Sequence, residues 1–282
     1  MQHILITGGS GYLGAELVQQ AGSLGTYRVS ATYHSHPHNH PDASFFSLDI
    51  RDSAATSALI SQLRPDLIIH TAYVQSGPDL HRVTVEGAEA VARTAAAVGA
   101  RLVHLSSDAL LDGEAPGRYA DSAPAAPVNP YGQAKADAEQ RVAALHPAAL
   151  IARTSLIYGG ATPSPHERLV LDALAGRSEV AFFTDEIRCP VHVRDLALAL
   201  LELAAQPVQG VLNVAGADAV SRHTFACLIA TAHGADPSRL RSAQSAAAQQ
   251  RRPRNCALDS SVAQGLIRTR LRGVHEVFAH RL

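Results

Sequence analysis

Short apolar runs alternate along the first half of the chain with Ala-rich segments of helical length. Unbroken apolar runs predict buried strands, and the longer segments between them predict helices. Strands are expected at residues 3–7, 27–33, 44–48, 67–71, 102–106 and 149–153, and helices at 12–21, 53–63, 83–98 and 130–145. This alternation predicts a parallel sheet that is covered by helices on both faces.

After residue 153 the rhythm changes. A turn-rich break is followed by an expected helix at 166–174, a strand at 179–184, a helix from Asp195 and a strand at 211–214, and the remainder is less regular. We therefore expect an α/β protein. Residues 1–155 form a Rossmann domain with a doubly wound parallel sheet, to which 188–215 return, and most of 156–282 forms a smaller α/β substrate-binding lobe. The polar, Pro-rich stretch 112–129 predicts a long loop of the kind that is usually functional or disordered.

Composition narrows the function classes. The chain has 282 residues, 46% hydrophobic and 17% charged, which is enough to bury a sizeable core and excludes global disorder. The 24 Lys and Arg against 25 Asp and Glu give a net charge of -1, which argues against nucleic acid or an anionic membrane as partner. Three widely spaced cysteines fit neither a disulfide framework nor a zinc motif, so we expect no metal and a cytoplasmic protein. No segment has the pattern of a signal peptide or a membrane span.

A glycine-rich loop follows the first expected strand. The sequence TGGSGYLG at residues 7–14 leads directly into an expected helix. In that context Gly8 can make the tight turn, Gly11 lets the backbone approach a pyrophosphate, and Gly14 lets the helix pack closely on the strand. The loop therefore predicts dinucleotide binding.

The end of the second expected strand bears on cofactor choice. NAD-selective sites usually carry a carboxylate there, whereas this chain has His34 and Ser35, which can donate to a 2′-phosphate. We predict NADP(H), with NAD as the alternative. Asp49, after the third strand, either reaches the adenine or serves as an acid at the start of the next helix. The histidines of 34–40 are interrupted by prolines and favour a solvated loop over a metal site.

A tyrosine and a lysine lie four residues apart at the start of another expected helix. Asn129-Pro130 is a helix-start signal, and it places Tyr131 and Lys135 on one helical face. A nearby ammonium stabilises phenolate and lowers the pKa of a tyrosine, which makes an acid/base unit for a carbonyl–alcohol exchange. Taken alone, the same spacing occurs by chance on many helices.

Ser106, Ser107 and Asp108 end the strand expected before that helix. Ligands of parallel sheets bind at the carboxyl ends of strands, so a serine here can hydrogen-bond a substrate carbonyl. Capping of the strand end is the other interpretation for either serine.

Together these motifs resemble the extended short-chain dehydrogenase/reductase superfamily, and in particular the dTDP-4-dehydrorhamnose reductase family of sugar-nucleotide reductases. Besides the loop at 7–14, the resemblance is carried by LDIRD at 48–52, RPDLIIHTA at 64–72, LSSD at 105–108, NPYGQAK at 129–135, RTSLIYG at 153–159, RCPVHVRDLA at 188–197, NVAG at 213–216 and RPRN at 252–255. It implies reduction of a 4-keto group on a nucleotide-linked deoxysugar, held between the two lobes of a monomer or homodimer.

The resemblance also implies roles for single residues. Tyr131 matches the proton donor, Lys135 its pKa-lowering and ribose-binding partner, and Ser107 the hydroxyl that polarises the carbonyl. The other expected cofactor contacts are Tyr12, Leu13, Ile50, Ala72 and Tyr73, the last two near the nicotinamide.

Arginines gather in the C-terminal region, where the substrate is expected to bind. Guanidinium groups suit a diphosphate, so Arg188, Arg252 and Arg254, with Asp108, are the expected substrate contacts. Each of these arginines can equally belong to a surface ion pair.

The chain departs from the family at three places. Ala109 and Leu156 stand where relatives carry aromatic residues, and Thr84 stands where many carry Asn. Ala109 also counts against the 4,6-dehydratase branch, which has Glu there. Two other functions stay open: a non-catalytic, NADP-binding regulatory subunit resembling the beta subunit of methionine adenosyltransferase, and a related sugar-nucleotide epimerase.

Overall fold

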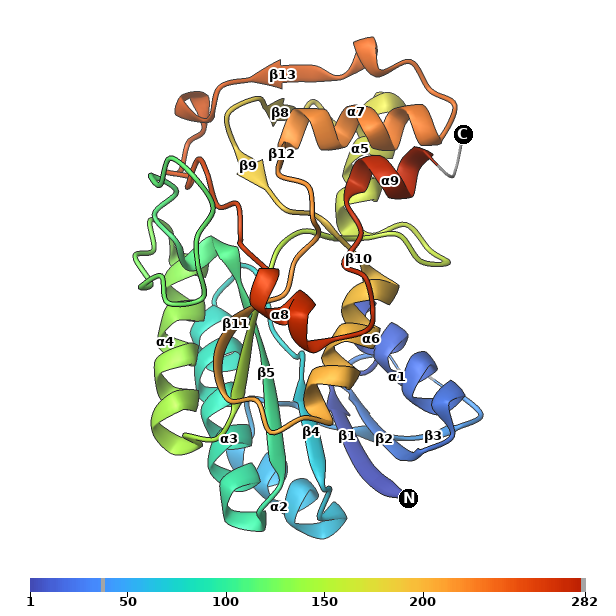
Figure 1. The fold of residues 1–282 in the computed structure, drawn as a ribbon, viewed down its shortest axis with the longest axis vertical. Coiled ribbons are helices and arrows are strands. Elements are labelled where there is room, and N and C mark those ends of the chain that lie inside the picture. The colour runs from blue at the N-terminus through green and yellow to red at the C-terminus, as the bar shows by residue number, and fades with distance from the viewer. Residues whose placement is uncertain (37–38, 280–282) are drawn as a thin grey trace.

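A seven-stranded parallel sheet has its carboxyl edge turned toward a smaller group of helices and short strands (Figure 1). The computed structural model describes residues 1–36 and 39–279. The strand order is β11-β6-β5-β4-β1-β2-β3, which confirms the doubly wound Rossmann sheet. The strands are β1 (Gln2–Thr7), β2 (Tyr27–Tyr33), β3 (Ala43–Ser47), β4 (Leu67–His70), β5 (Arg101–Ser107), β6 (Leu150–Thr154) and β11 (Gly210–Asn213).

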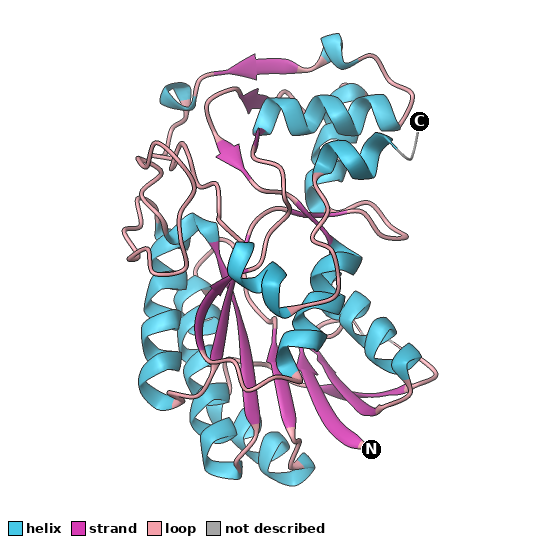
Figure 2. Ribbon diagram, viewed as in Figure 1, coloured by secondary structure: helices cyan, strands magenta, loops and turns pink. Residues whose placement is uncertain are grey.

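Helices cover both faces of this sheet (Figure 2). One face carries α1 (Tyr12–Leu24) and α6 (Val193–Ala204), and the other carries α2 (Ser53–Leu63), α3 (Gly87–Val98) and α4 (Pro130–Leu145). Ile4 and Ile6 of β1 belong to the first core, whereas Leu5 belongs to the second. Alternate residues of a strand point to opposite faces, so burial of both faces explains the unbroken apolar runs.

Two elements of the sheet layer come from late in the chain. β11 pairs with β6, with Val211 opposite Ile151, and α6 packs against α1. The N-terminal segment therefore does not complete this layer alone. The division of the chain at residue 155 stays a prediction.

The smaller lobe has a core of its own, in which the rings of Tyr158, Phe225 and Phe278 contact one another. Its helices are α5 (Pro165–Leu174), α7 (Arg222–Ala232) and α9 (Val274–Ala279). Its strands pair as β8 (Ala181–Phe183) with β13 (Arg241–Ala243), and β9 (Ile187–Arg188) with β12 (Val220–Ser221). The chain after β11, which was expected to be less regular, contains one longer helix, α7.

Shorter elements lie at the junctions. β7 (Ile157–Tyr158) pairs with β10 (Val191–His192) between the lobes, and α8 (Ser261–Leu266) packs near β11. The helix expected at 83–98 starts as a π-helix, η1 (Arg82–Glu86), and three 3-10 turns are η2 (Asp108–Leu110), η3 (Pro237–Arg239) and η4 (Ser245–Ala247).

The stretch 112–129 is a long loop, as expected, and it is fastened at several points. Arg118 donates to the carbonyl oxygens of Ala217 and Leu258. Asp121 accepts from the backbone of Asn213. The loop therefore connects β5 and α4 while it contacts the later part of the chain.

We expect the buried ion pair between Arg153 and Glu139, which lies next to this loop, to contribute strongly to the folding stability of the protein. Arg153 donates to the carboxylate of Glu139 at 2.7 and 2.9 Å and to the carbonyl oxygen of Ala123, and both side chains are almost fully buried. Arg153→Met leaves the Glu139 charge buried without its partner, which should lower the free energy of unfolding by about 3–5 kcal/mol. Urea denaturation measures the change.

The matched control is Arg177→Met. Arg177 makes an exposed ion pair with Asp172, and such pairs contribute about 1 kcal/mol or less. If both variants lose the same free energy of unfolding, the buried pair contributes no more to stability than the exposed pair.

Candidate active site

The glycine loop between β1 and α1 is shaped by close backbone approaches. Gly8 has φ +74°, and a Cβ built on Gly14 would lie 2.1 Å from the carbonyl oxygen of Gly8. The N-cap of α1 is Gly11, which has no side chain to cap the helix, and the first turn of α1 contains no acidic residue. Helix N-termini of this kind bind anions, so the loop fits a dinucleotide pyrophosphate.

The residues expected near the adenosine lie at neighbouring strand ends. His34 and Ser35 are exposed after β2, with 3.0 Å between the His34 Nδ1 and the Ser35 hydroxyl. The other ring nitrogen of His34 is 3.7 Å from Asp49. The structure thus brings His34, Ser35 and Asp49 together at one corner of the sheet.

Asp49 itself is held by an arginine that the sequence analysis passed over. The guanidinium of Arg51 donates to both carboxylate oxygens of Asp49, lowers the pKa of that carboxyl to about 2, and also donates to Asp79. Asp52, not Asp49, caps α2, by accepting from the backbone of Ala55. The acid that caps the start of α2 is therefore Asp52.

Ser107, Tyr131 and Lys135 converge above the carboxyl end of β5. The side chain of Asn129 caps α4 by accepting from Gly132, which fixes the turn that carries Tyr131. The ammonium of Lys135 donates to the carbonyl oxygen of Leu105 at 3.0 Å. The three residues expected to be catalytic therefore come from the end of one strand and the first turns of one helix.

Tyr73 joins this group from the segment after β4. Its ring centre lies 4.8 Å from the Lys135 Nζ and 6.0 Å from the ring centre of Tyr131. About half of the Tyr73 side chain is exposed. Tyr73 therefore lies on the solvent side of the Tyr131–Lys135 pair.

Burial dominates the acid–base properties of the group. It raises the pKa of Tyr131 well above its usual value, and the hydrogen bond with Ser107 only partly offsets this. Burial also lowers the pKa of Lys135 to about 8. Desolvation is the largest influence on the pKa of Tyr131 in this structure. The ammonium of Lys135 is directed to the Leu105 carbonyl and the Tyr73 ring, so a lowering of the phenol pKa by Lys135 stays a prediction.

Two histidines near Lys135 were missed. His70 of β4 and His104 of β5 are register partners with stacked rings 5.3 Å apart. Burial lowers the pKa of His70 to about 3 and that of His104 well below its usual value, and Lys135 lowers both further. Both rings are neutral near pH 7. A histidine in the same register of two adjacent expected strands was the available signal.

Asp108 links this group to the smaller lobe. It is buried, accepts a hydrogen bond from Ser155 at 2.6 Å, and lies 3.7 Å from the Arg188 Nε. Burial raises the pKa of Asp108, and Arg188 acts against that rise. Ser107 also accepts from the backbone of Ala109 and so caps η2, which means that its strand-end role and its contact with Tyr131 coexist.

The expected substrate arginines separate into two places. Arg188 and Arg252 both reach the buried carboxylate of Glu186, at 3.0 and 2.7 Å. Arg254 instead pairs with Glu114 of the long loop, and its side chain is more than half exposed. Within residues 1–36 and 39–279 there is neither a His, Cys, Asp and Glu group that could hold a metal nor a helix long and apolar enough to span a membrane.

Comparisons with known proteins decide the family. The RmlD substrate binding domain model matches residues 1–280. The chain belongs to this family. It is 33% identical over 266 residues to a dTDP-4-dehydrorhamnose reductase of Mycobacterium tuberculosis, covering 90% of this chain and 83% of the relative.

Two further similarities are informative. The beta subunit of Xenopus laevis methionine adenosyltransferase 2 is 30% identical over 257 residues, with 84% of this chain and 74% of the relative covered. A dTDP-4-dehydrorhamnose reductase of Bacillus anthracis, solved in complex with NADP, superposes with a TM-score of 0.82 at 24% identity, covering 99% of this chain and 97% of that one. Family membership confirms the resemblance drawn from the motifs and, with it, the expectation of an NAD(P)-dependent oxidoreductase.

The glycine loop allows a direct test of the cofactor site. Gly14→Ala forces α1 away from the Gly8 carbonyl, so we expect NADPH binding to weaken. A displacement that costs the complex about 1.4 kcal/mol weakens binding tenfold, and we expect at least that loss by calorimetry. Gly265→Ala, where an added Cβ meets nothing within 4 Å, should bind NADPH like the unchanged protein. If both variants bind NADPH with equal affinity, the cofactor is not held at the glycine loop.

Proposed function

We propose that the protein is an NADPH-dependent reductase of a nucleotide-linked 4-keto-deoxysugar. The observation that carries this proposal is the convergence of Ser107, Tyr131 and Lys135 at the sheet edge that also carries the glycine loop. The name of the Mycobacterium tuberculosis relative supports the substrate class. The NADP in the Bacillus anthracis protein of the same fold supports the cofactor.

The residues present suit the cofactor. The loop from Gly8 to Gly14 would hold the pyrophosphate, Ile50 would line the adenine, and Ala72 and Tyr73 would lie near the nicotinamide. His34 and Ser35 would meet a 2′-phosphate, with NAD as the alternative. When bound, the nicotinamide supplies a hydride to the carbonyl carbon.

The chain's own residues deliver the proton to the carbonyl oxygen of the substrate and stabilise the negative charge that develops there. Ser107 donates a hydrogen bond to the carbonyl oxygen, and Tyr131 delivers its proton there as negative charge develops. The raised pKa of Tyr131 means that the phenol keeps its proton until that moment. The Lys135 ammonium then stabilises the phenolate, because it is a cation in a buried site of low polarity.

The similarity to the methionine adenosyltransferase beta subunit supports a second candidate, a regulatory NADP-binding subunit. The retained set of Ser107, Tyr131 and Lys135 favours the reductase, because proton delivery needs all three. Tyr131→Phe separates the two functions.

In Tyr131→Phe the proton donor is missing while the ring stays. We expect turnover of a dTDP- or UDP-linked 4-keto sugar to fall by about 10²–10⁴-fold, with NADPH affinity nearly unchanged. NADPH oxidation at 340 nm measures the first and calorimetry the second. Tyr27→Phe, at the opposite edge of the sheet, is the control. Full turnover in Tyr131→Phe would rule out the proposed proton donor, and no turnover in the unchanged protein would favour the regulatory subunit.

The pH profile tests Lys135. We expect kcat/KM to fall above about pH 8, because the pKa of Lys135 is lowered to about 8 by burial and loss of its proton removes the charge that stabilises the phenolate. Arginine stays charged over this range, so the residual activity of Lys135→Arg should lack the fall. A profile that is flat to pH 10 in the unchanged protein, or the same fall in the variant, would argue against this role.

A further inference from the structure

A cluster of charges joins the end of β5 to the smaller lobe, and it holds more guanidinium groups than carboxylates. Its centre, Glu186 and Arg188, is buried, whereas Arg222 is partly exposed and Arg252 is exposed. Three guanidinium groups, those of Arg188, Arg222 and Arg252, act on the carboxylate of Glu186. Asp108 is a further acid that acts on Arg222, and burial raises its pKa. Excess positive charge in a desolvated place is costly unless an anion joins it.

Two of the three arginines are already committed. Arg188 forms an ion pair with Glu186 and donates to the carbonyl oxygens of Ile187, Pro253 and Arg254, and its side chain is almost fully buried. These contacts give Arg188 a structural role in the fold. Arg252 donates to both oxygens of Glu186.

Arg222 differs from Arg188 and Arg252 in the contacts of its side chain, although its backbone lies beside Glu186. Its N–H donates to the carbonyl oxygen of Glu186 at 2.9 Å, as β12 ends opposite β9. Its guanidinium, however, makes no hydrogen bond or ion pair with the part of the chain that the structure describes. Burial lowers the pKa of Arg222 to about 10, so the group stays charged near pH 7 without a bonded partner.

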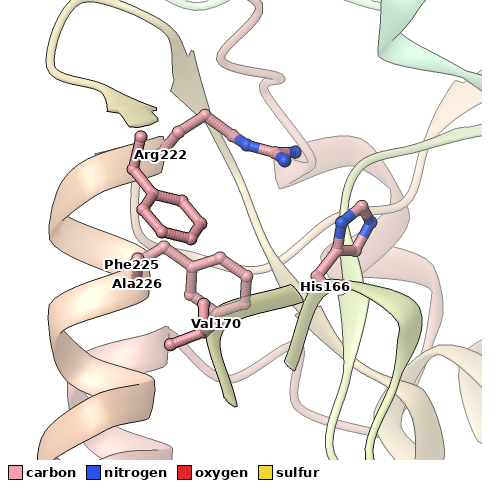
Figure 3. Close-up of a pocket in the computed structure, with 6 residues that line it drawn as sticks. His166, Val170, Arg222, Phe225 and Ala226 are labelled. Carbon is pink, nitrogen blue, oxygen red and sulfur yellow. The ribbon is translucent and has the colours of Figure 1, made fainter. Parts of the chain in front are cut away.

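The guanidinium borders a small pocket between α5 and α7 (Figure 3). Arg222, Phe225 and Ala226 line it from one face of α7, at the i, i+3 and i+4 positions, and His166 and Val170 line it from α5. Arg222 extends toward the imidazole of His166, with Phe225 and Val170 forming the apolar side of the pocket.

His166 adds a neutral polar group to this pocket. Burial is the main reason why its pKa falls to about 3, and Arg222 lowers it further. A neutral imidazole offers one N–H donor, and a guanidinium offers a planar fork of donors that matches the oxygens of phosphate or carboxylate. The first turns of two helices, which favour negative charge, meet at the same place.

The cluster is continuous with the catalytic group. Ser107 is followed by Asp108, which lies 3.7 Å from Arg188, and Arg188 lies 3.0 Å from Glu186. Glu186 is bonded through its backbone to Arg222. These contacts connect Arg222, through Glu186, Arg188 and Asp108, to the end of β5 that carries Ser107.

From these contacts we propose that Arg222 and His166 form an oxyanion-binding site that receives a negatively charged group of the substrate. This deepens the proposed function and rests on it for the position of the carbonyl. The oxyanion is a phosphate of the nucleoside diphosphate or a carboxylate on the sugar.

The test compares Arg222→Gln with Arg241→Gln by calorimetry in the presence of NADPH, since Arg241 makes an exposed ion pair with Glu179. The ligands are UDP, UMP, UDP-glucose and UDP-glucuronate. Loss of a charged hydrogen-bonding group weakens binding by about 10–100-fold, and we expect that loss for Arg222→Gln and nearly unchanged binding for Arg241→Gln. A loss with UDP and UDP-glucose identifies a phosphate, and a loss confined to UDP-glucuronate identifies a carboxylate.

Stability distinguishes binding from a structural role. Because the Arg222 guanidinium has no bonded partner in the described chain, Arg222→Gln without ligand should keep or raise the Tm. If that variant folds poorly, Arg222→Lys decides, because it keeps the charge and should recover part of the affinity, whereas a structural loss would not be recovered.

Three results would overturn the oxyanion site: unchanged affinities in Arg222→Gln, loss of affinity that Arg222→Lys does not recover in any part, or no binding of these four ligands by the unchanged protein. Failure of the reductase assay with UDP binding intact would reject the proposed function and leave the site in place.

Discussion

The parallel arrangement of the central sheet is the constraint on which the rest of this molecule depends. Because the strands run in one direction, their carboxyl ends share one edge, and the residues that follow them meet there. Gly8 follows β1, His34 follows β2, and Ser107 ends β5. Residues far apart in sequence therefore converge, whether their strands are neighbours, as β1 and β2 are, or are separated by another strand, as β1 and β5 are. The lobe over this edge is built from the chain between β6 and α6 and from the chain after β11.

The sequence predicted those parts of the molecule that short-range patterns determine. Strands such as β1 and β4 are buried on both faces, so each contains an unbroken apolar run, residues 4–6 in β1 and 67–69 in β4, that stands out from the helices between them. The same locality applies to Tyr131 and Lys135, since one helical turn separates them. Two-residue strands such as β9 and β12 have no period that could be recognised, and they exist because they pair with each other.

Interactions that depend on tertiary packing could not be predicted. Arg188 is a residue type that binds phosphate, yet its guanidinium donates to three backbone carbonyls, those of the preceding residue Ile187 and of the distant Pro253 and Arg254. The same applies to the pKa of Tyr131. Spacing along a helix shows that an ammonium is near, whereas the loss of water, which has the larger effect here, depends on what covers the phenol. Arg222 lay in a segment without a predicted helix, so its meeting with His166 had no signal.

Glu186 shows how the smaller lobe tolerates so much positive charge. Its carboxylate is almost inaccessible to water and forms ion pairs with Arg188 and Arg252, and these guanidinium groups help keep its pKa low despite burial. A buried carboxylate that is shared in this way stabilises the two arginines that pair with it and attracts a third at longer range. The arrangement leaves the guanidinium of Arg222 electrostatically supported but without a hydrogen bond to any residue that the structure describes. A group in that state is preorganised for a ligand, because its charge is held in place and no internal bond has to break before an anion binds.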